Sequence, residues 1–284
     1  MKRQKVSGQK NLPGLGKPGE AASLQRAYFN AIRLERDRVA SFGGYPFSIP
    51  SIRHLTRLEF HPAVTFFIGE NGSGKSTLLE AIAVKAGFSA EGGDRQLQFG
   101  THDTHSPLHD ALCLERSFEK PTDGFFLRAE SFYNVASELE RVEEETPTPS
   151  GIPFRAYGGK SLHRQSHGES FLAVLKERLQ GGGVYLFDEP EAALSPQRQL
   201  SVLTLMHRLV HHRSQLIIAT HSPILLAYPN SRIYQFTGEG IAEVQYTETE
   251  HYQITKDFLN RHERMLEILL TAEDEHLEST AWKL

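Results

Sequence analysis

The sequence is poor in cysteine and has no long apolar run. Its 284 residues include one cysteine, Cys113, which excludes an intrachain disulfide and fits a reducing compartment. No stretch of about 18 apolar residues is present, so a membrane-spanning helix is not expected. The first residues also lack the apolar segment of a secretory signal, and we expect a cytoplasmic protein.

A large excess of charge of either sign is also missing. The 31 Lys and Arg residues nearly balance the 35 Asp and Glu residues, and the formal net charge is -4. This balance excludes a global basic field that would attract nucleic acid or an anionic membrane, although it does not exclude a local basic patch. With 39% hydrophobic residues, the chain has the composition of a globular protein, sufficient for one large α/β domain or a domain with a sub-domain.

A glycine-rich segment at residues 69–77 is the clearest feature of the sequence. It follows an apolar run at residues 64–68 and precedes another at residues 78–83, an order that indicates strand, loop and helix. The spacing fits G-x-x-x-x-G-K-[ST], in which small residues let backbone N–H groups surround a phosphate chain at a helix N-terminus. A chance glycine-rich turn is the alternative, but the flanking strand and helix argue against it. The expected nucleotide contacts come from Gly69, Asn71, Gly72, Ser73, Gly74, Lys75, Ser76 and Thr77.

A second buried strand, predicted at residues 184–188, ends in two carboxylates. Asp188 is expected to hold Mg²⁺ together with the Ser76 hydroxyl, while Lys75 reaches the β- and γ-phosphates. Glu189 points differently because strand side chains alternate, and it can accept a proton from the water that attacks the γ-phosphate. The alternative is a turn without function after a buried strand. The presence of a phosphate loop in the same sequence argues against this alternative.

Two further segments place polar groups where they could contact phosphate. Ser166 is a candidate N-cap and Gly168 permits close backbone approach, so this helix start can face a second phosphate group. His221 follows the apolar run at residues 215–219, where its imidazole can contact a γ-phosphate or only cap the strand end.

Two sets of residues leave their roles open. Tyr45 or Phe47 can stack on adenine or pack in the core. His102, His105 and His109 suggest a metal site, but Ser-Pro interrupts the run and no H-E-x-x-H or cysteine pair accompanies it. For the histidines we therefore favour a loop beside the nucleotide or a partner subunit.

The remaining segments are expected to flank the nucleotide site. Strands near residues 28–39, 47–52 and 58–60 should form a meander, with the first strand at an edge. Residues 1–22, which are basic and rich in Gly and Pro, should form a disordered tail. Apolar residues at helical spacing predict an amphipathic helix over residues 256–284. We expect this helix to pack on the domain, and docking to a partner is the alternative.

The order and spacing of these motifs resemble the ABC-type ATPases. Residues 69–77 match the Walker A motif of that family, residues 184–189 match Walker B with its catalytic glutamate, and His221 matches the switch histidine. Residues 166–170 are similar to the signature motif, although His167 replaces a glycine there. The resemblance implies an α/β P-loop NTPase fold with a mostly parallel core sheet, an antiparallel β layer and a helical sub-domain carrying the signature.

The resemblance also implies Mg-dependent ATP hydrolysis by a homodimer. Family members pair head to tail, so Ser166, Gly168 and Glu169 of one copy would contact the ATP held by the other copy. The Q-loop glutamine of the family is missing, and Glu130 is the nearest stand-in. The implied catalytic residues are Lys75, Glu189 and His221, and the implied metal ligands are Ser76 and Asp188.

The residues after Walker B narrow the branch of the family. They read D-E-P-E-A-A-L-S-P, which resembles the soluble SMC-like, RecF-like and OLD-like ATPases more than transporter subunits. Only about ninety residues separate Walker A from the signature, too few for the heptad arms of SMC proteins. We expect an ATPase domain over residues 23–255, with the sub-domain at 88–170, coupled to a protein or nucleic-acid partner. A transporter ATP-binding subunit and an ATP sensor with negligible turnover are the alternatives.

Overall fold

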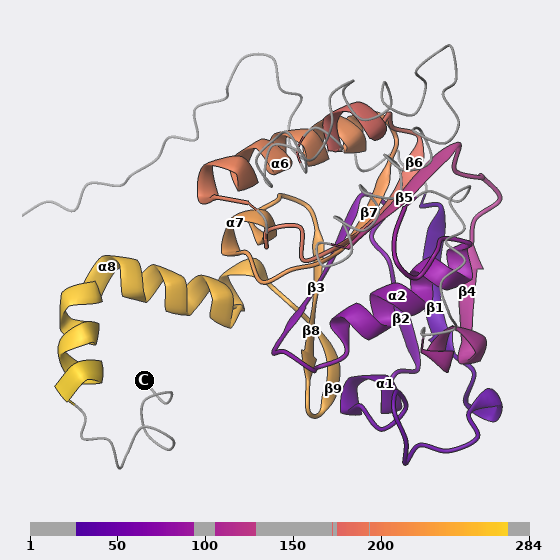
Figure 1. Ribbon diagram of the computed structural model, residues 1–284, viewed down its shortest axis with the longest axis horizontal. Helices are drawn as coiled ribbons and strands as arrows, with labels where there is room; N and C mark the ends of the chain where they lie inside the picture. Colours follow the sequence, from indigo (N-terminus) through magenta and orange to yellow (C-terminus); the bar gives the residue numbers. More distant parts are fainter. Residues whose placement is uncertain (1–26, 94–105, 129–171, 173–174, 193, 272–284) are drawn as a thin grey trace, which may run out of the picture.

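The computed structural model describes residues 27–93, 106–128, 172, 175–192 and 194–271 (Figure 1). The predicted basic tail and much of the predicted sub-domain lie outside these ranges. So do Glu130 and the three signature residues Ser166, Gly168 and Glu169.

A six-stranded sheet forms the centre of the fold, in the order β5-β6-β7-β3-β8-β9. The first five strands in that order run parallel and β9 is antiparallel to β8. The strands are β3 (Val64–Gly69), β5 (Asp123–Arg128), β6 (Gly183–Asp188), β7 (Gln215–Ala219), β8 (Arg232–Thr237) and β9 (Gly240–Val244). The prediction of an α/β fold with a mostly parallel core sheet is therefore confirmed. Because β7 lies between β3 and β6, the carboxyl ends of the three strands share one edge, where the predicted motifs meet.

A smaller antiparallel sheet has the order β2-β1-β4. Its strands are β1 (Phe29–Leu34), β2 (Arg57–Glu59) and β4 (Leu112–Arg116). The antiparallel layer is confirmed, but β1 is its central strand and not an edge strand as expected. The strand expected near residues 47–52 is also wrong: a short helix, α1 (Pro50–Arg53), occupies that place. Pro50 stands at the start of α1, where a missing N–H costs nothing, whereas in a strand it would interrupt the ladder.

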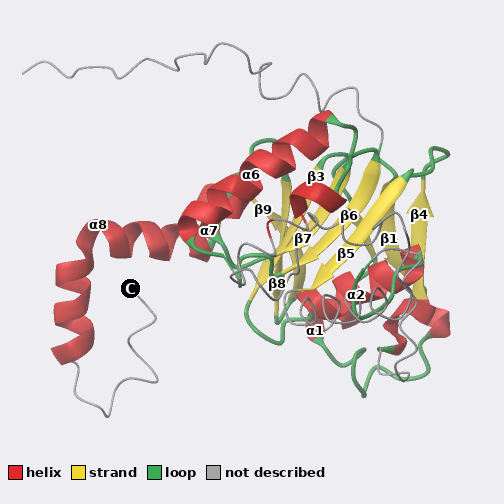
Figure 2. Cartoon of the chain, turned by 45° about the horizontal axis from the view of Figure 1, so that its top comes forward, coloured by secondary structure: helices red, strands yellow, loops and turns green. Residues whose placement is uncertain are grey.

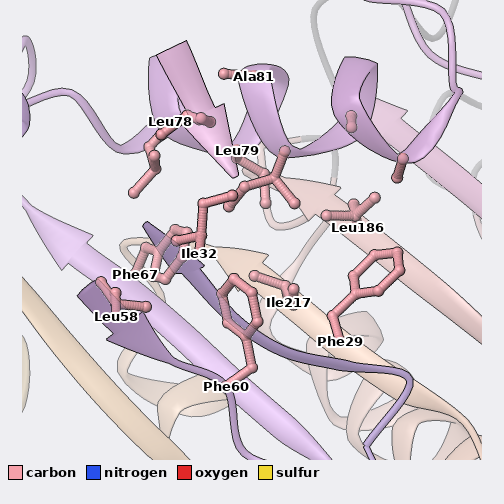
Figure 3. Close-up of a cluster of buried hydrophobic side chains, with 14 of the residues drawn as sticks. Phe29, Ile32, Leu58, Phe60, Phe67, Leu78, Leu79, Ala81, Leu186 and Ile217 are labelled. Carbon is pink, nitrogen blue, oxygen red and sulfur yellow. The ribbon is translucent and has the colours of Figure 1, made fainter. Parts of the chain in front are cut away.

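Side chains of the central sheet alternate between two cores because neighbouring strand residues point to opposite faces. In β3, Phe66 and Ile68 pack into the cluster that contains the buried residues of α6 (Pro196–His211). Phe67 faces the other way, into the cluster formed with α2 (Lys75–Ala86) and β1. Figure 2 shows the sheet between these layers, and Figure 3 shows the second cluster, where α2 and the smaller sheet meet the central sheet.

The Gln215 side chain, fully buried at the start of β7, ties the two sheets together. Its Oε1 accepts hydrogen bonds from the N–H groups of Tyr28 (3.1 Å) and Phe29 (2.8 Å). Its Nε2 donates to the carbonyl oxygens of Phe29 (2.8 Å) and His61 (3.0 Å). One amide thus satisfies four backbone groups at the junction, which fixes the smaller sheet against the strands of the nucleotide site.

The other helices are short, except for α8 (Glu250–Thr271). α2 ends at Ala86 with Gly87 as its C-cap, and α6 follows its N-cap Ser195. α8 begins before the predicted residue 256. None of its residues from 250 to 271 is buried, so this described part does not pack along the domain as expected. It projects from the domain and changes direction at Arg261 (Figure 1). Crossing a bilayer would require a longer apolar helix than any found in the described part of the chain. The short helices are α7 (Pro223–Leu226), η2 (Arg36–Arg38), η3 (Pro107–Ala111) and η5 (Tyr246–Glu248).

Candidate nucleotide site

The glycine-rich loop joins the end of β3 to the start of α2, as the sequence predicted. Gly69, Gly72 and Gly74 have φ angles of 143°, 77° and 97°, values that side-chain-bearing residues rarely adopt. A Cβ at Gly69 would overlap the carbonyl oxygen of Phe236, and one at Gly74 would lie 2.8 Å from Ser51 Oγ. Glycine is therefore required by both conformation and space at two of the three positions.

Lys75 is buried at the first position of α2. Its ammonium group donates hydrogen bonds to the carbonyl oxygens of Gly69 (2.8 Å) and Glu70 (2.9 Å). Burial lowers the pKa of Lys75, and the carboxylates of Glu189 and Asp188 act in the opposite direction. The loop thus holds a cation at the edge of the sheet where the predicted phosphates would lie.

Ser76 and Asp188 meet across two elements. Ser76 Oγ donates a hydrogen bond of 2.8 Å to Asp188 Oδ1, joining the start of α2 to the end of β6. A hydroxyl and a carboxylate are hard oxygen donors, the type that Mg²⁺ prefers, so the pair fits this ion. Sequence reasoning missed Arg128 at the end of β5, whose Nε lies 3.7 Å from Asp188 Oδ2 and whose Nη1 lies 2.6 Å from Glu80 Oε2.

Glu189 leaves the strand in an unusual conformation. Its φ is 50°, in the left-handed region, and its N–H donates to the carbonyl oxygen of Ala219 (2.9 Å). A non-glycine residue in this region stores about 1–2 kcal/mol of strain. The turn places Glu189 Oε1 3.7 Å from His221 Nε2 and leaves the glutamate side chain 37% exposed. This carboxylate therefore stays accessible to solvent beside the imidazole, which is the arrangement a general base requires.

His221 follows the end of β7 and is held from two sides. Its N–H donates to Glu191 Oε1, and its Nδ1 lies 3.2 Å from Nε2 of His251 in α8. Burial lowers the pKa of His221 to about 4, with smaller contributions from the Lys75 charge and from His251. Burial also raises the pKa of Glu191. Sequence reasoning missed Glu191 and His251; the carboxylate two residues beyond Glu189 was a usable local signal, whereas nothing near residue 251 suggested its contact.

Two hollows border the glycine-rich loop. One, of about 330 Å³, is lined by residues 71–72 and 74–77 together with Glu189, Tyr45 and Ile49, and so contains most of the predicted phosphate-binding residues. The other, of about 630 Å³, lies on the other side of the loop, between residues 69–73, the end of β8 and the first residues of α8. The first hollow is the candidate nucleotide pocket because Lys75, Ser76 and Glu189 all line it.

One of the two candidate aromatic residues remains accessible at this pocket. Tyr45 is 67% exposed, and its hydroxyl lies 3.4 Å from Thr77 Oγ1. Phe47 instead packs edge-on against Phe42, with 6.3 Å between ring centroids, at the border of the core. The geometry therefore favours Tyr45 for stacking on a base.

The structure leaves several predicted site residues without a test. Ser166, Gly168 and Glu169 lie outside the described residues, as do His102 and His105. The described histidine of that loop, His109, pairs locally through Nδ1 with the carbonyl oxygen of Ser106 (3.1 Å) and through Nε2 with Asp110 Oδ1 (3.3 Å). Among the described residues, no group of three or more metal-ligating side chains converges.

Comparisons with known families match two parts of the sequence. The family described as "AAA domain" matches residues 41–164, which include the glycine-rich loop. The family described as "AAA domain, putative AbiEii toxin, Type IV TA system" matches residues 170–227, which include Asp188, Glu189 and His221. Both are ATPase families, which agrees with the predicted resemblance.

Curated relatives are similar at a modest level. The L-cystine transport system ATP-binding protein TcyN of Escherichia coli is 27% identical over 60% of this chain and 74% of its own length. The macrolide export ATP-binding/permease protein MacB of Escherichia coli is 26% identical over 56% of this chain, but the match spans only 26% of MacB.

Two solved structures match most of this chain at low sequence identity. The SMC head domain from Thermotoga maritima is 15% identical, with a TM-score of 0.41, and the match covers 76% of this chain and 98% of that one. CbiO1 of Clostridium perfringens, part of an ABC transporter complex, is 17% identical, with a TM-score of 0.45, and the match covers 76% of this chain and 91% of that one.

Proposed function

We propose that this chain, a P-loop ATPase of the ABC/SMC-like kind with an ABC/AAA-type nucleotide-binding domain, hydrolyses ATP with Mg²⁺ and switches by ATP-driven pairing of two copies. One observation carries the hydrolysis proposal. The carboxyl ends of β3, β6 and β7 bring together the Lys75 ammonium, the Ser76–Asp188 pair and the Glu189 carboxylate beside His221.

Binding is assigned to the loop and to the residues that face it. Backbone N–H groups of residues 69–77 and the N-terminus of α2 would surround the phosphates, with Lys75 turning from the loop carbonyls toward the γ-phosphate. Ser76 and Asp188 would hold Mg²⁺, which, when bound, neutralises charge on the phosphate oxygens. The exposed Tyr45 ring would stack on adenine.

The chemistry is assigned to Glu189 and His221. The Glu189 side chain is partly exposed and accepts a proton from the attacking water. A neutral His221 can donate from Nε2 to an oxygen of the γ-phosphate, which stabilises the charge that develops there. The lowered pKa of His221 keeps the ring neutral at physiological pH, so that the ring adds no second cation beside Lys75.

Pairing of two copies is proposed from the single set of motifs and from the position of Glu189. This residue lines the nucleotide pocket, and its side chain is 37% exposed. In the arrangement that the resemblance implies, Ser166, Gly168 and Glu169 of a second copy would cover the nucleotide. ATP held between two copies would then hold the dimer together, and hydrolysis would release it.

The hydrolysis proposal is tested by phosphate release from ATP. Lys75→Ala should abolish both ATP binding and turnover. Glu189→Gln should retain ATP binding but lose turnover by at least about 10²-fold, the usual contribution of a general base. Glu263→Gln on α8, an exposed site, is the matched control and should match the unsubstituted chain. Unchanged turnover in Glu189→Gln would remove Glu189 from the mechanism.

A transporter subunit is the second candidate, and it is favoured by the names of TcyN and MacB. Under this alternative the ATPase would be stimulated by an integral membrane partner. An affinity experiment separates the transporter subunit from the ATPase proposed above. Detergent extracts of the source cells are passed over immobilised Glu189→Gln protein with ATP and Mg²⁺. Retention of an integral membrane protein that stimulates ATP turnover by the unsubstituted chain would favour the transporter.

A further inference from the structure

The first turn of α8 lies beside the glycine-rich loop and His221. The rest of the helix projects away from the domain (Figure 1). His251 and Ile254 line the hollow on the other side of the glycine-rich loop, together with residues 69–73. His251 Nε2 lies 3.2 Å from His221 Nδ1, and the two ring centroids are 5.4 Å apart. The C-terminal helix therefore contributes one ring directly behind the imidazole that faces Glu189.

Two neutral imidazoles at this distance must divide the donor and acceptor roles. Burial lowers the pKa of both His221 and His251, so both rings are neutral at physiological pH. A neutral imidazole carries its proton on one nitrogen and accepts with the other. If His251 donates, the proton of His221 is on Nε2; if His251 accepts, that proton is on Nδ1 and Nε2 is bare.

The groups around the pair favour the first arrangement. His221 Nε2 has no hydrogen-bond partner within the described part of the chain, but it faces Glu189 Oε1 at 3.7 Å. A protonated Nε2 directs an N–H dipole at that carboxylate, whereas a bare Nε2 would direct a lone pair at negative charge. The arrangement in which His251 accepts would also leave a buried N–H donor on His251 Nδ1 without a partner among the described residues.

We propose that His251 is a positioning residue for hydrolysis: its Nε2–H donates to His221 Nδ1 and holds His221 in the Nε2–H tautomer. The proposal rests on the function proposed above, in which that N–H meets the γ-phosphate. Without the donor, His221 would populate both tautomers, and the Nδ1–H form would present a lone pair to the phosphate oxygens. In this role His251 acts through His221, since it does not line the pocket assigned to the nucleotide.

Nitrogen-15 NMR of the imidazole rings tests the tautomer without any turnover. The unsubstituted chain, with its 14 histidines labelled and His221 assigned from the His221→Gln spectrum, should show a protonated Nε2 and a bare Nδ1 on His221. His251→Gln should keep this pattern, because the glutamine amide can place a donor where Nε2 lies. A protonated Nδ1 on His221 in the unsubstituted chain would overturn the proposal.

Steady-state kinetics provide the second test. His251→Leu should lower kcat about tenfold, the effect of one lost hydrogen bond, and leave the KM for ATP unchanged. His251→Gln should restore kcat to within about twofold, because it keeps the donor. His262→Leu, at an exposed α8 position, is the control and should not change kcat. Equal loss of kcat in the Leu and Gln variants would overturn the proposal.

The two tests separate this proposal from the proposed function. If the unsubstituted chain does not hydrolyse ATP, the function fails, whereas the NMR pattern still decides the contact between the rings. If ATP is hydrolysed but His221 carries its proton on Nδ1, the positioning role of His251 fails alone. If His251→Leu does not fold, the unsubstituted chain and His251→Gln still give the answer.

Discussion

Replacement of Gly74 by alanine should damage the nucleotide site more than the same change at Gly72. Both glycines have positive φ angles, 97° at Gly74 and 77° at Gly72. They differ in the space that a methyl group would find. A Cβ at Gly74 would lie 2.8 Å from Ser51 Oγ and 3.1 Å from Ile49 Cγ2, whereas a Cβ at Gly72 meets no atom within 4 Å.

The expected losses of stability follow from the backbone strain and from the crowding around the added methyl group. Left-handed backbone costs a non-glycine residue about 1–2 kcal/mol, and the smaller entropy of the unfolded chain returns about 0.4–1 kcal/mol. Gly72→Ala should therefore lower the free energy of unfolding by about 1 kcal/mol. Crowding at Gly74 adds about 1–3 kcal/mol, which brings Gly74→Ala to about 3 kcal/mol.

Urea unfolding of the two variants measures this difference. Combining Gly74→Ala with Ser51→Ala should be less damaging than the sum of the single changes by about 1 kcal/mol, because the closest clash is removed. ATP should stabilise the Gly72→Ala protein but not the Gly74→Ala protein, since a shifted loop misplaces the start of α2. Equal losses of stability in both variants, or no coupling with Ser51, would refute the steric reasoning.

Three further predictions concern stability and binding. Gln215→Leu should lower the free energy of unfolding by about 3 kcal/mol, because four backbone groups lose their hydrogen-bond partner while the apolar side chain offsets part of the loss. Gln197→Leu, at an exposed position, is the control, and a loss below about 1 kcal/mol in urea unfolding would contradict the role of Gln215. As pH falls from about 6.5 to about 4, the unsubstituted chain should lose stability relative to His221→Gln. The reason is that the His221 imidazole is protonated in the unfolded chain but stays neutral in the folded chain. Parallel curves of stability against pH for the two proteins would contradict the lowered pKa. Ser76→Ala should weaken the Mg²⁺-dependent part of ATP stabilisation in thermal unfolding and leave the Mg²⁺-free part unchanged, and equal weakening of both would argue against its role as a metal ligand.

The sequence predicted those parts of the site that depend on short patterns. The loop with Lys75 and Ser76, and the acidic end of β6, were predicted because a strand, a turn and a helix start are local structures with their own residue preferences. The meeting of Ser76 with Asp188 followed from the rule that parallel strands bring their carboxyl ends to one edge.

Contacts that depend on tertiary packing were not predicted. His251 reaches His221 across 30 residues of sequence, and nothing in the local pattern of α8 distinguishes its first turn from a helix that packs elsewhere. Arg128 lies beside Asp188 because β5 pairs with β6 in that register, which no single strand sequence specifies. The helix α1 replaced an expected strand because Pro50 favours a helix start, a local signal that alternating apolar residues had masked.

The mass of the Glu189→Gln protein in solution, measured by light scattering with and without ATP and Mg²⁺, tests the central claim most directly. The account predicts a monomer without nucleotide and a stable dimer with ATP, because the trapped nucleotide joins two copies. ADP should leave the protein monomeric, since the γ-phosphate is missing. A protein that stays monomeric while saturated with ATP would contradict the account.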